Sequence, residues 1–186
     1  MNPIKNKKDL VATIDDIRNF SYSYLEKYSP SKQQLRIYLF KKLIKINQRK
    51  SSKKEIFNLI DSVITSLVDQ KLLSDRYYSD VKSKAFLKRG YSLNKIRYNL
   101  IKKGIDEKYI KDSISKIKEN ESDPDFFSAI KICKRRRIGP CREESNRTLF
   151  YKKDISILAR SGFSYEISKK VLSIPKEEFK KFCTMI

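Results

Sequence analysis

Four consecutive basic residues, Lys134, Arg135, Arg136 and Arg137, form the sharpest local feature of the sequence. Their charged groups could bind phosphates or an acidic protein surface, because charge-assisted hydrogen bonds to such oxygens are strong. The same residues could instead end a helix, where positive charge complements the negative end of the helix dipole. The two roles are compatible. The sequence therefore predicts a cationic helix end, followed closely by Arg142.

Two basic pairs flank one short predicted helix. Lys88 and Arg89 precede it, and Lys102 and Lys103 end it, so they could form a basic rim if both corners face one side. Taken alone, each pair can be explained by the favourable interaction of positive charge with the negative end of a helix dipole. Tyr98 lies on the face of this helix opposite the apolar stripe, and an exposed ring can stack on a base, a contact of ~1–3 kcal/mol.

A further basic group recurs at helical spacing in the first third of the chain. It comprises Lys41, Lys42, Lys45 and Arg49. Residues three and four positions apart lie on one side of a helix, so the group could form a binding stripe. A solvated helix face is the plainer explanation of the same pattern.

The whole chain shares this bias, with 43 Lys and Arg against 22 Asp and Glu and a formal net charge of +21. Such a protein is attracted to polyanions, meaning nucleic acid or an anionic membrane surface. An AT-rich coding bias, which also favours Lys, Ile and Asn, explains part of the excess. No apolar run approaches the ~18–20 residues needed to span a bilayer, so we expect no membrane partner.

The chain contains no histidine, which excludes catalysis by Ser-His or Cys-His pairs. The three cysteines, Cys133, Cys141 and Cys183, show no CxxC spacing and cannot complete a common four-ligand zinc site. Carboxylate clusters with a nearby base and glycine-rich phosphate loops are also absent. We therefore expect no enzymatic activity, no cofactor and no metal. The odd cysteine count and an N-terminus without an apolar segment favour a cytoplasmic protein.

A repeated corner organises the elements that would position these residues. Gly90, Gly104 and Gly162 each follow a basic residue within two positions and precede an apolar residue and then a Ser or Asp. Glycine can close a helix in the left-handed conformation, and the Ser or Asp can cap the next helix. Any helical protein contains one such corner, but its recurrence indicates a repeated module.

No segment alternates with period two between hairpin turns, so we predict an all-α fold. Three tandem three-helix repeats would stack into an elongated, curved body. We predict a flexible basic arm at residues 1–13 and a C-terminal helical tail at 174–186. The three repeats between them are predicted at residues 14–72, 73–120 and 124–173. Residues 141–147 are polar and predict a loop.

Each repeat contains a helix that begins after a serine, at Ser31, Ser92 and Ser164. In the first two repeats, inward-facing apolar residues follow the serine by four and eight positions. In the third, Ile167 and Val171 predict a spacing that is one position shorter. The repeat is therefore predicted to be divergent rather than strict.

Several motifs resemble those of the RecX family, the regulatory proteins of the bacterial RecA recombinase. They match the family's order and spacing over residues 14 to 173. The motifs are SPSKQQLRIYLFKKL (29–43), LLSDRYYSDVKSKAFLKRGYSLNKIRYNLIKKGID (72–106), CKRRRIGPCR (133–142) and ILARSGFSYEISKKVL (157–172). The stretch from 72 to 106 is the most specific. Ser168 departs from the pattern, because a more apolar residue is usual there.

The resemblance implies three tandem three-helix units, no catalytic residues and no cofactor. It also implies a protein that binds the deep groove of the RecA filament on single-stranded DNA and limits filament growth and strand exchange. The setting would be recombination, DNA repair and the SOS response. We expect a monomer whose partners are the RecA filament and single-stranded DNA, with double-stranded DNA as a further candidate.

A plain nucleic-acid-binding module is the alternative. In that case the helix from Ser92 to Lys103 would enter the major groove as a recognition helix. The absence of a clear dimerisation seam weakens this hypothesis. Inhibition of a recombinase, as against specific binding of a short duplex, would separate the two.

Overall fold

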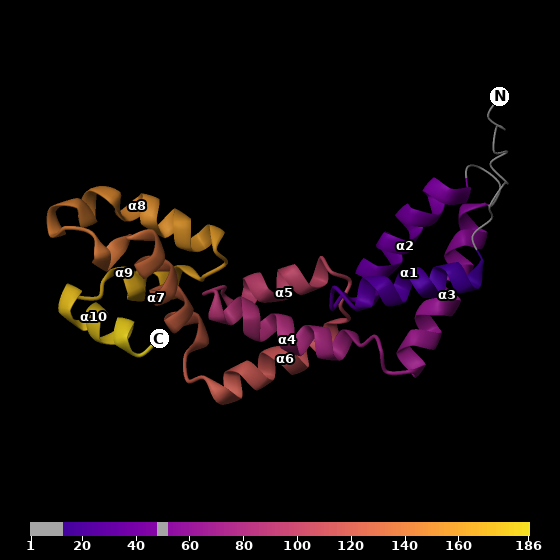
Figure 1. The fold of residues 1–186 in the computed structure, drawn as a ribbon. Coiled ribbons are helices and arrows are strands. Elements are labelled where there is room, and N and C mark those ends of the chain that lie inside the picture. Colours follow the sequence, from indigo (N-terminus) through magenta and orange to yellow (C-terminus); the bar gives the residue numbers. More distant parts are fainter. Residues whose placement is uncertain (1–12, 48–51) are drawn as a thin grey trace, which may run out of the picture. The chain divides into compact units, whose positions relative to one another are not determined.

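A computed structural model of the chain describes residues 13–47 and 52–186 (Figure 1). Within those residues the regular structure is helical and no strand is present, so the predicted all-α class is confirmed. The helices are α1 (Ile14–Leu25), α2 (Lys32–Asn47), α3 (Lys53–Asp69), α4 (Asp75–Lys88), α5 (Leu93–Ile101), α6 (Glu107–Asn120), α7 (Pro124–Arg136), the 3-10 turn η1 (Gly139–Cys141), α8 (Glu144–Arg160), α9 (Tyr165–Leu172) and α10 (Lys176–Thr184). Nearly all of the predicted basic arm lies outside the described residues.

The chain divides into two compact units, Met1–Tyr78 and Ser79–Ile186, and the boundary falls inside α4. Unit 1 contains α1, α2 and α3. Unit 2 contains most of α4 with α5 and α6, then α7, η1, α8 and α9, and finally α10. The helices thus follow one another in tandem groups of three, as predicted. The residue boundaries of the three repeats stay a prediction, because the second and third share one compact unit.

The three helices of unit 1 pack around one apolar core. α2 directs Leu35, Leu39 and Leu43 into it, and each is at most 1% exposed. Ser31 begins this helix: its hydroxyl accepts a hydrogen bond from Gln34 N at 3.2 Å, and the Gln34 side chain accepts one from Ser31 N at 3.1 Å. This reciprocal capping box satisfies two backbone N–H groups at the start of the helix.

The three predicted glycine corners are all present in unit 2. Gly90, Gly104 and Gly162 have φ angles of 79°, 73° and 87°, in the left-handed region that favours glycine. After each glycine the next N–H reaches back to a carbonyl of the last helical turn, as from Tyr91 N to Phe86 O at 3.0 Å. The corners therefore close α4, α5 and α8 with Schellman endings.

In the third repeat Val171 is fully buried and Ile167 packs against the core, so both face inward as predicted. Ser168 and Leu172, four and eight positions after Ser164, are also buried, at 1% and 4% exposed, so the spacing of the other repeats is present as well. Ser168 can occupy a core position because its hydroxyl donates a hydrogen bond to Ser164 O at 2.8 Å. Because Ser168 is polar, a comparison of the spacing of apolar residues does not identify it as a core position.

The predicted loop at 141–147 is partly wrong, because α8 begins at Glu144. A carboxylate in the first turn suits the positive end of a helix. Arg147 lies in this turn and donates hydrogen bonds to Leu172 O at 2.8 Å and Ile174 O at 2.9 Å. The polar composition therefore reflects a helix start and a side chain directed at backbone carbonyls, not an irregular segment.

Candidate polyanion-binding surface

Two basic segments that are distant in sequence come together where the second and third repeats meet. Arg135, in the last turn of α7, donates a hydrogen bond to Arg89 O at 2.9 Å, across 46 positions of sequence. Gly90 packs against the same helix, and a Cβ at Gly90 would lie 3.1 Å from Lys131 Cβ. The corner after α4 and the C-terminal half of α7 therefore form one surface, which we call the junction surface.

The start of α5 is fixed by the third repeat on two sides. The hydroxyl of Ser92 donates a hydrogen bond to Ser161 O at 3.0 Å, and Leu93 N donates one to the Asp125 carboxylate at 2.7 Å. Burial raises the pKa of Asp125, and the hydrogen bond from Leu93 N opposes that shift. These contacts hold the two repeats in one arrangement around the junction surface.

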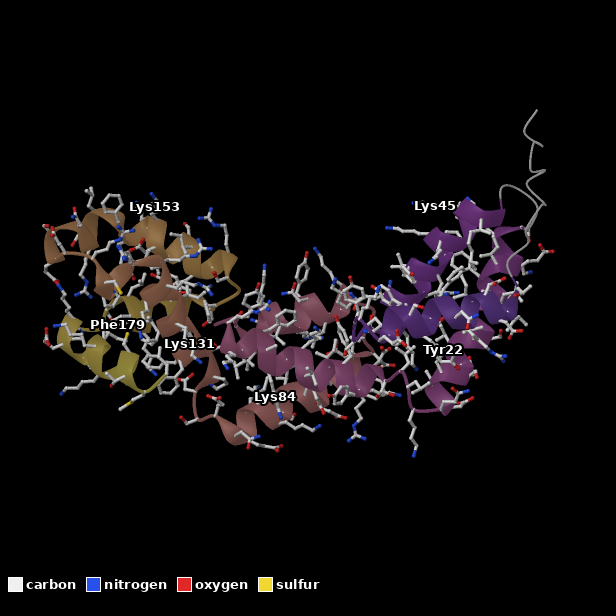
Figure 2. The ribbon with its side chains drawn as sticks, viewed as in Figure 1. Tyr22, Lys45, Lys84, Lys131, Lys153 and Phe179 are labelled. Atoms are coloured by element: carbon white, nitrogen blue, oxygen red, sulfur yellow. The ribbon has the colours of Figure 1, made fainter. Side chains whose placement is uncertain are left out.

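A groove of about 480 Å³ lies between α4, α6 and α7 beside this surface. Four lysines line it, Lys84, Lys88, Lys116 and Lys131, of which Figure 2 labels Lys84 on α4 and Lys131 on α7. Lys116 forms an ion pair with Asp80 at 2.6 Å. The other three lysines form no ion pair with any residue that the structure describes, so their ammonium groups can bind the phosphates of a ligand.

The remaining members of the cluster at 134–137 have different surroundings. Lys134 Nζ donates a hydrogen bond to Cys183 O at 3.2 Å, which ties α7 to α10. Arg136 and Arg137 are exposed, and Arg137 ends α7 in a left-handed conformation with φ 53°. The cluster is a cationic helix end, as predicted, and Arg136 and Arg137 are its solvent-exposed members directly after Arg135.

Arg142 is held within the third repeat. Its Nε and Nη2 donate hydrogen bonds to the two oxygens of Asp154 at 2.7 and 2.8 Å, and Gly139 N donates a third at 2.8 Å. Asp154 is 1% exposed, and the hydrogen bonds to it raise the pKa of the Arg142 guanidinium. The structure therefore gives Arg142 a role in the fold, and we leave it out of the binding surface.

The exposed ring that the sequence predicts on α5 is present. Tyr98 is 50% exposed, with Lys102 Nζ 4.5 Å and Lys95 Nζ 5.7 Å from its ring centroid. A hydrogen bond with Lys102 lowers the pKa of the Tyr98 phenol. Lys102 and Lys103 lie at the end of the nine-residue α5, about 14 Å from its start. Of the other basic pair, Arg89 contacts α7 through its carbonyl oxygen.

The predicted basic stripe on α2 is divided. Lys41 and Lys45 border a groove on the side of α3, whereas Lys42 Nζ lies 4.0 Å from the ring centroid of Phe20 on α1. Neighbouring helical residues point about 100° apart, which lets Lys41 border the groove while Lys42 turns toward Phe20 on α1. Arg49 lies outside the described residues.

Lys84 and Lys131 line the groove but were not among the predicted residues. Each lies four positions before a predicted one, Lys88 and Arg135, and residues four apart share a helix face. Helical periodicity applied to the basic residues could have found both. Periodicity could not show that these two lysines, which lie on α4 and α7, line the same groove.

The described part of the chain holds no group of three Cys, Asp or Glu side chains that could bind a metal ion. Burial raises the pKa of the thiols of Cys133, Cys141 and Cys183, which reduces their thiolate fraction. Among the helices of the described ranges, none is both long enough and apolar enough to cross a bilayer.

The fold and this surface define a class: a basic, all-helical protein of tandem three-helix repeats, with a cationic surface where two repeats meet. No protein-family model matches the chain. The regulatory protein RecX of Myxococcus xanthus (strain DK1622) is 28% identical over 163 residues, which cover 84% of this chain and 83% of that protein. The regulatory protein RecX of Clostridium perfringens (strain SM101 / Type A) is 27% identical over 113 residues, or 61% of this chain and 51% of that protein.

Solved structures show the same likeness in fold. The crystal structure of RecX from Lactobacillus salivarius matches with a TM-score of 0.59 and 18% identity, covering 90% of this chain and 97% of that one. A second crystal structure of regulatory protein RecX matches with a TM-score of 0.58 and 20% identity, covering 85% of this chain and 72% of that one. The resemblance to the RecX family that the sequence motifs indicate is thereby confirmed.

Proposed function

We propose that this chain regulates a RecA-type recombinase by binding the groove of its filament on single-stranded DNA, without catalysing a reaction itself. The junction surface carries this proposal, because the hydrogen bond from Arg135 to Arg89 O unites two basic segments beside a lysine-lined groove. Cations fixed on packed helices can match the phosphates of a DNA strand without first being ordered. The likeness to RecX proteins supports the choice of a recombinase as the partner.

Occupation of the filament groove would act sterically. A chain that bridges neighbouring subunits would block the addition of the next subunit and the entry of a second DNA. Filament extension, ATP hydrolysis and strand exchange would then fall together. The proposal includes a monomer in the cytoplasm whose ligands are single-stranded DNA and, as a second ligand, double-stranded DNA.

The test is a titration of the protein into a recombinase that hydrolyses ATP on single-stranded DNA. We expect inhibition at amounts well below one chain per recombinase subunit. Substitution of Arg136→Ala with Arg137→Ala should raise the half-inhibitory concentration several-fold, since both side chains are exposed at the end of α7, directly after Arg135 of the junction surface. Lys53→Ala with Lys54→Ala removes the same charge from the exposed first turn of α3 and is the control. Unchanged ATP hydrolysis with the wild-type chain would overturn the proposal.

A helix-turn-helix-like module that reads duplex DNA through α5 receives less support. Arg97 forms an ion pair with Glu107 at 2.9 Å, and Lys102 lies against Tyr98, so these side chains are engaged within the protein. Specific binding of a short duplex, with no effect on the recombinase, would establish this alternative. Salt-sensitive binding of bare DNA alone would not, because a net charge of +21 produces it in either case.

A further inference from the structure

Helix α2 is apolar on two of its faces, and only one of them is covered in unit 1. Leu35 and Leu39 are fully buried in the three-helix core. On another face, Ile37 and Ile44 remain 46% and 44% exposed, and Phe40 between them is half-buried. The core accounts for the first face and leaves the second without a structural role.

The second face borders a groove of about 520 Å³ between α2 and α3, which we call the α2–α3 groove. Its lining residues are Gln33, Arg36, Ile37, Phe40, Lys41, Ile44, Lys45 and Phe57. The rings of Phe40 and Phe57 stack with centroids 4.2 Å apart at 10°, and the Arg36 guanidinium lies 4.7 Å above Phe57. The floor of the groove is therefore built from side chains that already support one another.

The Phe57 ring is already engaged within the protein, because it stacks on Phe40 and contacts the Arg36 guanidinium. A nucleic-acid base needs an exposed ring face on which to stack, and both rings are only partly exposed. The exposed apolar area that remains is contributed mainly by the aliphatic side chains of Ile37 and Ile44. The groove is thus better suited to aliphatic side chains of a protein than to bases.

The edge of the groove is positively charged. Lys41 and Lys45 are exposed and lie one helical turn apart on α2, and neither forms an ion pair with any of the described residues. The third cation, Arg36, already binds Asp61 at 2.6 Å. A partner that covers the isoleucines would bring its own flanking side chains against the two lysines, and carboxylates are the groups that match them.

We propose that the α2–α3 groove docks an amphipathic helix of a protein partner, whose apolar stripe is flanked by acidic residues. Ile37 and Ile44 are seven positions apart, or about 10.5 Å along the helix axis, with Phe40 between them. That is the length of two helical turns, over which a bound helix presents anchors at i, i+3 or i+4, and i+7 to a groove. This proposal is argued from residues of unit 1 alone. Within the proposed function the partner is the recombinase, and only that identification rests on the proposed function.

The first experiment uses the full chain and a designed probe. The probe is a 14-residue helical peptide with leucines on one face and glutamates beside them, and its counterpart carries lysines in place of the glutamates. The acidic peptide should bind, and Ile37→Ser with Ile44→Ser should weaken it at least tenfold. The basic peptide should not bind. Equal affinity of the acidic peptide for wild type and this double variant, or no binding to either, would overturn the proposal.

The control variant, Ile14→Ser with Leu149→Ser, also removes two exposed apolar side chains, on α1 and α8. It should leave the affinity for the acidic peptide unchanged within twofold. Circular dichroism should show the same helix content for both double variants, because none of the four residues is buried. Lys41→Ala with Lys45→Ala should weaken peptide binding and reduce its salt dependence.

The second experiment places the same variants in the recombinase assay and in binding to bare single-stranded DNA. Ile37→Ser with Ile44→Ser should raise the half-inhibitory concentration at least tenfold and leave DNA affinity unchanged within twofold. Loss of DNA affinity would assign the groove to bases, and a dimer that this variant abolishes in sedimentation would assign it to a second copy. Either result would overturn the proposal. If wild type leaves the recombinase unaffected, the proposed function fails, while the peptide experiment still decides the groove.

Discussion

The α2–α3 groove of unit 1 and the lysine-lined groove of unit 2 carry similar cations over different floors. In the first, Lys41 and Lys45 border stacked aromatic rings and exposed isoleucines. In the second, Lys84 and Lys131 border the Lys116–Asp80 ion pair and the buried side chains of Leu87 and Ile117. A lysine count does not distinguish these sites. What lies between the cations does, because the exposed isoleucines of the first groove favour a protein partner, whereas Leu87 and Ile117 of the second are buried and leave its lysines to bind a polyanion.

The largest expected effect is a loss of folding stability, and it tests whether Arg142 is a structural cation or one available to a partner. Asp154→Ala should destabilise unit 2 by about 3–5 kcal/mol, because it leaves Arg142 and Gly139 N without their shared buried acceptor. Urea unfolding followed by circular dichroism measures the change. Arg136→Ala is the control and should alter stability by less than about 0.5 kcal/mol, since that side chain is exposed. A loss below about 1 kcal/mol for Asp154→Ala would return Arg142 to the set of available cations.

The next prediction concerns the contact that fixes α5 to the third repeat. Asp125→Ala should cost about 1–3 kcal/mol, because it leaves Leu93 N without an acceptor in a part-buried position. Asp125→Asn keeps an oxygen acceptor there and should cost less. Unfolding free energies of the two variants, measured at pH 7, provide the comparison. Equal losses would show that the charge, and not the hydrogen bond, holds the junction together.

A charge-removal pair tests the comparison of the two grooves directly. Lys88→Ala with Lys131→Ala should reduce the salt slope of single-stranded DNA binding by about 1.4, the expectation for two lost phosphate contacts. Lys41→Ala with Lys45→Ala removes the same charge from the other groove and should change the slope much less. Fluorescence anisotropy over a range of salt concentrations measures both. Equal reductions would remove the distinction between the two grooves.

The smallest expected effect is a pH dependence that the two units share. Burial raises the pKa of Asp75, whose carboxylate accepts a hydrogen bond from Lys32 N, and burial likewise raises that of Asp125. A raised pKa in the folded state means that each group favours folding below its ordinary value of 3.8 and loses this contribution as the pH rises through the folded value. The free energy of unfolding of Asp75→Asn and of Asp125→Asn, each taken relative to wild type, should therefore rise between pH 3.5 and pH 7.

Unfolding midpoints in urea at pH 3.5, 4.5, 6 and 7 would measure that difference for each variant. Asp16→Asn is the control of opposite sign, because hydrogen bonds from Thr13 lower the pKa of Asp16. It should lose stability relative to wild type over the same rise in pH. A difference between wild type and the two buried-Asp variants that does not change with pH would contradict the prediction.

The sequence by itself determined the elements that depend on neighbouring residues. The glycine corners at Gly90, Gly104 and Gly162 could be predicted because a left-handed residue and a following cap are local requirements. The helical end of the cluster at 134–137 followed from the same dipole argument. In the third repeat the apolar pattern identified Ile167 and Val171 but not the buried Ser168, because burial of its hydroxyl depends on a hydrogen bond that apolar periodicity cannot register.

Only the tertiary structure decided which charges are available to a partner. Arg142 and Arg135 are both basic residues near one helix end, yet one binds a buried carboxylate and the other caps the α4 corner. The two exposed isoleucines, Ile37 and Ile44, form a docking face only because α3 supplies Phe57 beneath them. Each assignment depends on which helices pack together, and side chains brought into contact from distant segments leave no periodic signal in the chain.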